Sequence, residues 1–305
     1  MGESPLFIFV SLMILFYYNF YVNQQVKNVH RFPGHMKKAI QQIEDKLKVV
    51  DFVVELLDAR IPLSSQNEYI EKILAKKPRL FVLTKKDMAD DTQTQKWVEF
   101  FTKEGNKAIA VDLKNRNDFD LIFKKIIEFC KVKDEKMAKK GIKNISTRAM
   151  IVGIPNVGKS TLINYLAKKS IVDVANKPGL TKNVRRVKIN NIELLDTPGI
   201  LQPQYEDKKK AINLAMIGSM NQNILPKDQI AEKCFDFLKE LYESSLEKRY
   251  SLPNKDLELF EFLEFLAFKR GLLLKNGEPD IEKSTEIFLN EFKNGIICKF
   301  TIERL

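Results

Sequence analysis

Residues 153–160 read GIPNVGKS and carry the glycines, the lysine and the hydroxyl of a phosphate-binding loop. They follow an apolar run typical of a strand and precede a helical pattern, as such a loop requires. Glycine lets the backbone approach a phosphate closely, and the N–H groups at the start of the next helix point positive dipoles at it. Lys159 would reach the terminal phosphates and the Ser160 hydroxyl would bind Mg2+. We expect the other nucleotide contacts of this loop from Asn156, Val157, Gly158 and Thr161.

Two further motifs fit the two segments that sense a γ-phosphate. DTPG at residues 196–199 ends an apolar run, which would place the Asp196 carboxylate near the metal and the Gly199 N–H near the γ-phosphate. Alone, this sequence could form an ordinary turn. KPGLT at residues 177–181 lies between the two motifs, and Thr181 would bind Mg2+ when the γ-phosphate is present. The alternative is a plain loop threonine.

Residues 84–87, TKKD, are the candidate motif for reading the nucleotide base. Asp87 could accept hydrogen bonds from both the ring N–H and the exocyclic amine of guanine, while the stem of Lys85 lies over the base. Thr84 stands where an asparagine would tie this loop to the phosphate loop, so we expect that tie to be lost. A TKKD in a lysine-rich chain is weak by itself. Its order is informative, because it precedes the phosphate loop, whereas in an ordinary small GTPase it follows.

The elements that must position these motifs follow an α/β pattern from residue 26 onward. Apolar runs predict strands at residues 52–57, 79–83, 108–111, 149–152, 186–189 and 192–195. Helices between several of them favour a mostly parallel sheet covered on both faces. Apolar residues at helical spacing predict a first helix, at Met36, Ile40, Ile43, Leu47 and Val50. After residue 205 the strand signal fades, and residues 230–242 and 256–274 are expected to be helical.

Charge and cysteine usage limit the class of protein. The chain has 305 residues and a net charge of +11, which favours polyanionic partners such as nucleic acid. Residues 205–305 hold 16 basic and 18 acidic side chains, so the positive excess lies before them. The three cysteines form no CxxC pair, which argues against a disulfide scaffold or a zinc site and fits a reducing cytosol.

An uncharged apolar stretch covers residues 5–22, at the short edge of what can span a membrane. It lacks the preceding basic residues and the cleavage site of a signal peptide. Three interpretations remain: an upstream start site or dispensable extension, a membrane anchor, or a buried helix. We therefore divide the chain into an apolar extension (residues 1–25), a GTPase domain (26–204) and a helical domain (205–305).

The chain resembles the ribosome biogenesis GTPase A family of circularly permuted GTPases, which has mitochondrial relatives. The likeness runs from about Phe32 to the C-terminus and rests on FPGHM at residues 32–36, LDARIP at 57–62, and the motifs at 153–162, 177–181 and 194–200. It implies a circularly permuted P-loop domain followed by a smaller all-helical domain. The implied activity is GTP hydrolysis coupled to late assembly of the large ribosomal subunit, with the helical domain helping to bind rRNA. Asp112-Leu113-Lys114 matches the second base-contacting loop poorly, so no site is assigned there.

Catalysis needs a group that orients the attacking water, and Ile200, which follows DTPG, cannot do this. His35, in FPGHM, resembles the residue to which the family assigns the task, and its Pro-Gly turn could swing it toward the γ-phosphate. The alternative is a histidine at a helix start that binds its neighbours or RNA. We expect His35 and Lys159 to be the catalytic residues. Asn156 lies where cation-activated relatives coordinate K+, so K+ is a second candidate cofactor beside Mg2+.

Basic residues before the phosphate loop are candidates for binding RNA phosphates, with a solvated connector as the alternative. They are Lys131, Lys133, Lys136, Lys139, Lys140, Lys143 and Arg148, and Arg60 and residues 208–210 could extend this surface. The expected partners are GTP and GDP, the large ribosomal subunit and rRNA, with DNA excluded and a membrane less favoured. A cytoplasmic ribosome-assembly GTPase is thus the first hypothesis. A membrane-tethered regulatory GTPase is the second, and an ATPase, based only on Thr84, is a distant third.

Overall fold

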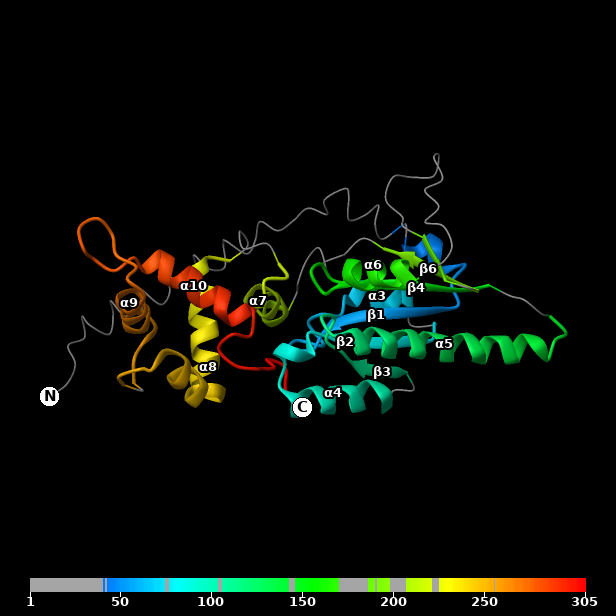
Figure 1. Cartoon of the computed structure of the whole chain (residues 1–305), viewed down its shortest axis with the longest axis horizontal. Helices are drawn as coiled ribbons and strands as arrows, with labels where there is room; N and C mark the ends of the chain where they lie inside the picture. Colours follow the sequence, from blue (N-terminus) through cyan, green and yellow to red (C-terminus); the bar gives the residue numbers. More distant parts are fainter. Residues whose placement is uncertain are drawn as a thin grey trace, which may run out of the picture.

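The computed structural model describes residues 41, 43–74, 77–103, 106–142, 146–169, 186–189, 191–197, 207–220, 225–254 and 256–305. A layered α/β part occupies one end of the long axis and a group of helices the other (Figure 1). The sheet-containing part holds the phosphate loop. The expected α/β class is confirmed.

One six-stranded sheet runs in the order β3-β2-β1-β4-β6-β5. Its strands are β1 (Phe52–Asp58), β2 (Arg79–Thr84), β3 (Lys107–Ala110), β4 (Thr147–Gly153), β5 (Arg186–Ile189) and β6 (Ile192–Asp196). Neighbours are parallel except the β5–β6 pair, which is antiparallel. The apolar runs of the sequence therefore predicted all six strands of this sheet, because strands buried on both faces read as continuous apolar segments.

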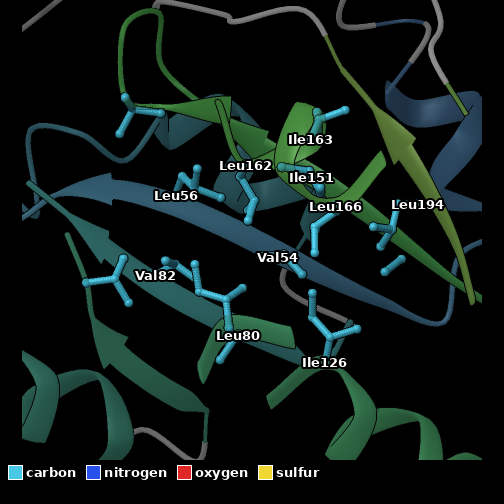
Figure 2. Close-up of a cluster of buried hydrophobic side chains, with 14 of the residues drawn as sticks. Val54, Leu56, Leu80, Val82, Ile126, Ile151, Leu162, Ile163, Leu166 and Leu194 are labelled. Atoms are coloured by element: carbon cyan, nitrogen blue, oxygen red, sulfur yellow. The ribbon is translucent and has the colours of Figure 1, made fainter. Parts of the chain in front are cut away.

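Helices cover both faces of the sheet, since alternate residues of each strand point to opposite faces. On one face Val54 and Leu56 pack with side chains of α5 (Arg116–Ala138) and α6 (Lys159–Lys169). Figure 2 shows this layer, with Ile126 of α5 and Leu162 of α6 over the strands. On the other face Val53 and Leu57 pack with residues of α3 (Glu68–Leu74) and α4 (Asp91–Lys103). The described part of the predicted first helix, residues 41 and 43–47, packs on this second face through Ile43.

The helical region is built from α7 (Lys208–Met216), α8 (Lys227–Tyr250), α9 (Leu259–Arg270) and α10 (Ile281–Lys293). They enclose a core of their own, in which aromatic rings dominate: Phe235, Phe262, Phe288, Phe292 and Phe300. Both predicted helices, residues 230–242 and 256–274, are present with shifted ends. α9 begins with reciprocal side-chain-to-backbone bonds between Glu258 and Glu261 and ends at Gly271, whose φ is +65°. This capping explains why α9 is shorter than the apolar pattern suggested.

Residues 297–305, here called the C-terminal segment, leave the helical region and return to the α/β part. Figure 1 shows this red trace running from α10 to α4. The backbone N–H of Ile302 donates to the Arg60 carbonyl (2.8 Å), and the indole N–H of Trp97 donates to the Glu303 carbonyl (2.8 Å). The two parts of the molecule are thus joined by the segment that comes after the last helix.

The apolar stretch at residues 5–22 lies outside the described residues. Across the part of the chain that the structure describes, no helix combines the length and apolar character needed to cross a bilayer.

Candidate nucleotide-binding site

The motifs singled out in the sequence converge on one edge of the sheet. β1, β2, β4 and β6 are mutually parallel, so their carboxyl ends lie together, at Asp58, Thr84, Gly153 and Asp196. Ligands of open α/β sheets bind at this edge. Parallel pairing therefore brings the phosphate loop, the base motif and the start of DTPG into one site.

The backbone of the phosphate loop needs its glycines. A Cβ on Gly153, where φ is +150°, would lie 2.6 Å from the carbonyl oxygen of Leu56. A Cβ on Gly158, where φ is +104°, would lie 2.3 Å from the Cδ1 of Leu113. Asn156 also has a positive φ of +61°, a conformation that asparagine tolerates better than most residues. The backbone of this loop thus makes the tight turns that a phosphate-binding loop requires.

Lys159 lies at the first position of α6, and its ammonium donates to the carbonyls of Gly153 (2.8 Å) and Ile154 (2.7 Å). Burial lowers the pKa of Lys159 to about 8, and the charge of Asp196 acts in the opposite direction. Val157 is buried. The side chains of Asn156, Ser160 and Thr161, which we expect to meet the nucleotide or its metal, are exposed.

The end of β6 is fixed against the phosphate-loop strand. The Thr197 hydroxyl donates to the Ile151 carbonyl (2.8 Å), and Asp196 lies opposite Ile151 in the sheet. The ammonium of Lys46, on the first helix, donates to the Asp196 carbonyl (3.0 Å).

Three candidate residues lie outside the described residues, namely His35, Thr181 and Gly199.

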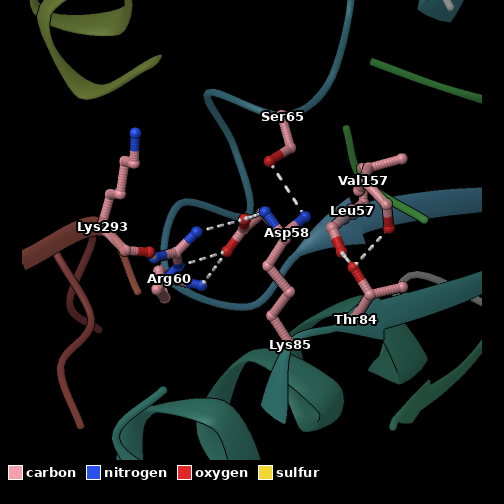
Figure 3. A network of polar contacts seen from close by, with 8 residues as sticks. All are labelled: Leu57, Asp58, Arg60, Ser65, Thr84, Lys85, Val157 and Lys293. Atoms are coloured by element: carbon pink, nitrogen blue, oxygen red, sulfur yellow. Dashed lines mark hydrogen bonds and ion pairs between the residues drawn. The ribbon is translucent and has the colours of Figure 1, made fainter. Parts of the chain in front are cut away.

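Thr84 bonds the base motif to the phosphate loop, although a threonine in place of asparagine was expected to remove this link. Its buried hydroxyl lies 2.9 Å from the Val157 carbonyl of the phosphate loop and 3.0 Å from the Leu57 carbonyl of β1 (Figure 3). One hydroxyl proton is shared between these two acceptors. The expectation that this link is lost was wrong. The threonine hydroxyl donates to backbone carbonyl oxygens, whose positions cannot be read from the sequence motif.

Lys85 and Arg60 share one buried carboxylate. The Asp58 carboxylate accepts from the Lys85 ammonium (2.9 Å) and from two guanidinium nitrogens of Arg60 (both 2.9 Å), as Figure 3 shows. Burial acts to raise the pKa of Asp58, but the positive charges of Arg60 and Lys85 hold it well below its ordinary value. Arg60 is 0% exposed, so its expected part in an RNA-binding surface is wrong.

Asp87 lies in a short 3-10 helix, Lys86–Met88, directly after Lys85. Its carboxylate accepts from the ammonium of Lys114 (2.7 Å), and this bond raises the pKa of Lys114 above its usual value. Lys114 belongs to the loop after β3 to which the sequence assigned no site. Only the position of this loop could have indicated a site. The loop follows β3, which is parallel to its neighbour β2, and it therefore lies at the same edge of the sheet as the base motif.

The basic residues before the phosphate loop do not form one uniform surface. Lys133 pairs with Asp51 (2.7 Å) and Arg148 with Glu193 (3.0 Å), so internal carboxylates neutralise these two. The remaining described side chains are exposed, on or just after the C-terminal half of α5: Lys131, Lys139 and Lys140. Lys143 and the side chain of Lys136 lie outside what the structure describes.

Comparison with known proteins places this geometry in a family. Residues 148–249 match a family model described as 50S ribosome-binding GTPase. The chain is 42% identical over 277 residues to ribosome biogenesis GTPase A of Bacillus cereus, covering 89% of this chain and 92% of that protein. It is 34% identical over 274 residues to the protein of the same name from Thermotoga maritima, covering 90% and 93%.

More distant relatives and solved structures agree. The mitochondrial ribosome-associated GTPase 1 of Xenopus tropicalis is 32% identical over 254 residues, covering 79% of this chain and 80% of that protein. The GNP-bound crystal structure of YlqF from T. maritima is 30% identical, with a TM-score of 0.63 over 88% of this chain and 98% of that chain. A GDP-bound YlqF structure gives a TM-score of 0.62 at 30% identity, over 86% and 98%.

These relatives are named GTPases, and none supports the alternative of an ATPase. The base motif precedes the phosphate loop here, which is the order of a circularly permuted domain, and the match to YlqF extends over both the α/β and the helical parts. The chain therefore belongs to the ribosome biogenesis GTPase A family and is a circularly permuted P-loop enzyme that hydrolyses GTP.

Proposed function

We propose that this protein is a GTPase switch that assists late assembly of the large ribosomal subunit by binding the pre-subunit and its rRNA in a nucleotide-dependent way. The observation that carries the proposal is the base motif bonded to the phosphate loop through Thr84, in a chain whose relatives are named for ribosome biogenesis. In this proposal residues 26–204 form the GTPase domain, residues 205–305 the helical domain and residues 1–25 an extension. The protein acts in the cytoplasm.

Guanine recognition is assigned to the base motif. Asp87 accepts from the ring N–H and the exocyclic amine of guanine, and the Lys85 stem covers one face of the base. Thr84 acts indirectly, by holding the loop against Val157. The triphosphate lies over residues 156–161, with Lys159 on the β- and γ-phosphates and the Gly199 N–H on the γ-phosphate.

Mg2+ is assigned to Ser160, Asp196 and Thr181. Hydroxyl and carboxylate oxygens are the ligands that Mg2+ prefers. Ser160 lies at the start of α6, and Asp196 lies at the end of β6, which pairs with the strand that leads into the phosphate loop. When bound, the ion neutralises charge that develops on the β- and γ-phosphates. K+ is assigned to the exposed Asn156, which would add positive charge beside the same phosphates.

His35 is assigned to orienting the attacking water, since Ile200 cannot do so. Support comes from Lys46. This residue lies in the helix that is predicted to begin at Met36, directly after His35. Its bond to the Asp196 carbonyl brings this helix to the end of β6 where DTPG begins. The water-orienting group would then approach from the segment that precedes this helix.

Two surfaces are assigned to rRNA. One is the exposed lysine cluster at the end of α5. The other is a pocket of about 390 Å³ between the start of α8 and α10, whose lining includes Lys283 and Lys293 together with the ion pair of Lys227 and Glu286. Neither surface shares side chains with the nucleotide contacts, so RNA and nucleotide can be bound together.

Sedimentation with purified large subunits tests the proposed function. The protein should co-sediment with the subunit in the presence of a non-hydrolysable GTP analogue and much less with GDP. Lys159→Ala removes the ammonium assigned to the phosphates, so it should lose turnover and this nucleotide dependence. Equal sedimentation with GDP and the analogue would contradict a nucleotide-dependent function, and near-normal hydrolysis by Lys159→Ala would contradict the assigned site.

Substitution of His35 tests the catalytic assignment separately. His35→Ala should keep GTP and subunit binding within a few-fold but lower subunit-stimulated hydrolysis at least ~10-fold, a threshold set below the ~10²- to 10⁴-fold that a general acid–base group typically contributes. Hydrolysis is measured with and without large subunits. A wild-type stimulated rate in this variant would remove the histidine from the mechanism and leave the GTPase assignment intact.

A further inference from the structure

The loop that carries the base motif, residues 84–90, is held from three sides. Thr84 attaches it to the phosphate loop and Lys85 attaches it to Asp58 of β1. On the third side the C-terminal segment supplies two bonds, from the Phe300 N–H to the Met88 carbonyl (3.0 Å) and from the Asp90 N–H to the Thr301 hydroxyl oxygen (3.2 Å). The third support comes from a part of the chain that follows the helical region.

Arg60 connects the second support to the third. Its guanidinium binds the same Asp58 carboxylate that anchors Lys85, and it also donates to the Lys293 carbonyl at the end of α10 (Figure 3). The Phe300 ring lies 5.6 Å from the guanidinium carbon. Asp58 and Arg60 are both fully buried. A displacement of the C-terminal segment would therefore disturb the anchor of Lys85.

The C-terminal segment is itself fixed on the α/β part. The Glu303 carboxylate accepts from the backbone N–H groups of Leu63 (2.6 Å) and Ser64 (3.0 Å), from the Ser64 hydroxyl, and from the Asn213 amide of α7 (3.3 Å). Burial raises the pKa of Glu303, while these bonds lower it. The segment thus lies between the helical region and the base loop with bonds to both.

Lys85 needs such support, because its φ of +58° is a conformation that a lysine rarely adopts without surrounding contacts. Because the Lys85 ammonium is bound to Asp58, the aliphatic stem of Lys85 is fixed at both ends, by the backbone and by this ion pair. A stem held in this way presents a preorganised surface to a base, which raises affinity by reducing the ordering cost of binding. If the position of the stem depends on the C-terminal segment, then so does guanine affinity.

We propose that Arg60 and residues 300–303 are positioning residues for guanine recognition, and that guanine binding and docking of the helical region stabilise each other. The proposal rests on the assignment of Lys85 and Asp87 as base-contacting residues. The coupling is reciprocal by thermodynamic necessity: support of the loop by the segment raises guanine affinity, and bound guanine strengthens the segment's bonds.

The test compares two threonine-to-valine substitutions in the full chain. Thr301→Val removes the oxygen that accepts from Asp90, whereas Thr285→Val removes a hydroxyl of α10 that donates to Ile281 within its own helix. Affinities are measured for GDP and for inosine diphosphate, which lacks the exocyclic amine read by Asp87. Thr301→Val should weaken GDP binding about 3- to 10-fold, the loss of one hydrogen bond, and reduce the preference for GDP over inosine diphosphate. Thr285→Val should leave that preference unchanged.

A wild-type preference for GDP in Thr301→Val would overturn the proposal. Asp87→Ala is measured in parallel, because an unchanged preference in that variant would instead contradict the base assignment on which the proposal rests. Hydrogen exchange of the unsubstituted protein gives an independent result if Thr301→Val does not fold. GDP should slow exchange of the Phe300 and Ile302 amides more than inosine diphosphate does. Equal protection by the two nucleotides would also overturn the proposal.

Discussion

The Lys159 ammonium lies among backbone carbonyls, where its charge is partly compensated but poorly solvated. Burial lowers its pKa to about 8, against an ordinary value of 10.5, although Asp196 opposes the shift. The unfolded chain therefore binds more protons than the nucleotide-free folded protein between these two values. In that window the contribution of Lys159 makes the folded state more stable as pH rises, while below pH 8 the cost of burying the charge is fully present.

Nucleotide binding should reverse this shift, because phosphate charge favours a protonated lysine. GDP binding at about pH 8.5 should then take up most of one proton, whereas at about pH 7 Lys159 should contribute almost none, since it is already protonated. Calorimetric titrations in two buffers of different ionisation enthalpy measure the uptake. Lys159→Met provides the control. Equal uptake by the variant and the wild-type protein would mean that another group titrates.

Some single residues could be placed from the sequence, whereas the contacts of others could not be predicted. The types of Lys159, Asp196 and Asp87 were enough to place them, because strand ends and motif spacing determine their positions. Thr84 and Arg60 were misjudged, since the acceptors of the threonine are backbone carbonyls and the arginine is neutralised by a neighbour two positions away in the sequence. A residue's type does not reveal whether its partner lies inside or outside the protein.

At the scale of elements, the strands could be predicted closely and the connections could not. β5 was predicted with its observed ends, and the other strands differ by one or two residues at one or both ends, because buried parallel strands have continuous apolar sequences. The C-terminal segment had no such signal. It has no periodic pattern, and its bonds reach Arg60, Met88 and Trp97, which lie more than two hundred positions earlier.

Helix α5 illustrates an element with two separate roles. Its N-terminal half contributes Ile122 and Ile126 to the core, while Lys139 and Lys140 follow its last turn and are exposed. In Figure 1 this end of α5 extends away from the helical region. A change of charge at this end should therefore affect a binding partner without affecting the sheet.

Lys139→Glu should weaken binding to rRNA fragments and flatten the dependence of affinity on salt, because fewer counterions are released per bound phosphate. Lys124→Glu, at an exposed position in the N-terminal half of the same helix, is the matched control. Filter binding at several salt concentrations measures both effects. If the two variants show the same affinity and the same salt slope, the end of α5 is an ordinary solvated surface.

At the scale of the whole molecule, Glu303 joins three parts that are distant in sequence. Its carboxylate satisfies donors from the loop after β1 and from α7, while its carbonyl accepts from Trp97 of α4. Removing the carboxylate takes the acceptor from the partly buried N–H and hydroxyl of Ser64, and one of two acceptors from the Asn213 amide. The interface between the α/β part and the helical region should then be the first to loosen.

Glu303→Ala should lower the free energy of unfolding by roughly 2–4 kcal/mol, the cost of leaving such donors unpaired. Glu286→Ala is the control, because Glu286 forms an exposed ion pair with Lys227 and its loss should change the free energy of unfolding little. Urea unfolding followed by Trp97 fluorescence compares them, as this is the single tryptophan of the chain. Similar midpoints for both variants would show that the carboxylate contributes little to the interface.

The bonds between the C-terminal segment and the base loop also set an order of events during synthesis. The base loop is translated early and its partners more than two hundred residues later, so a nascent chain can complete the sheet and the phosphate loop well before residues 300–303 exist. Contacts between such distant residues form late, because long loops must close first. The base loop of a growing chain would thus receive its last support only after the helical region has been made.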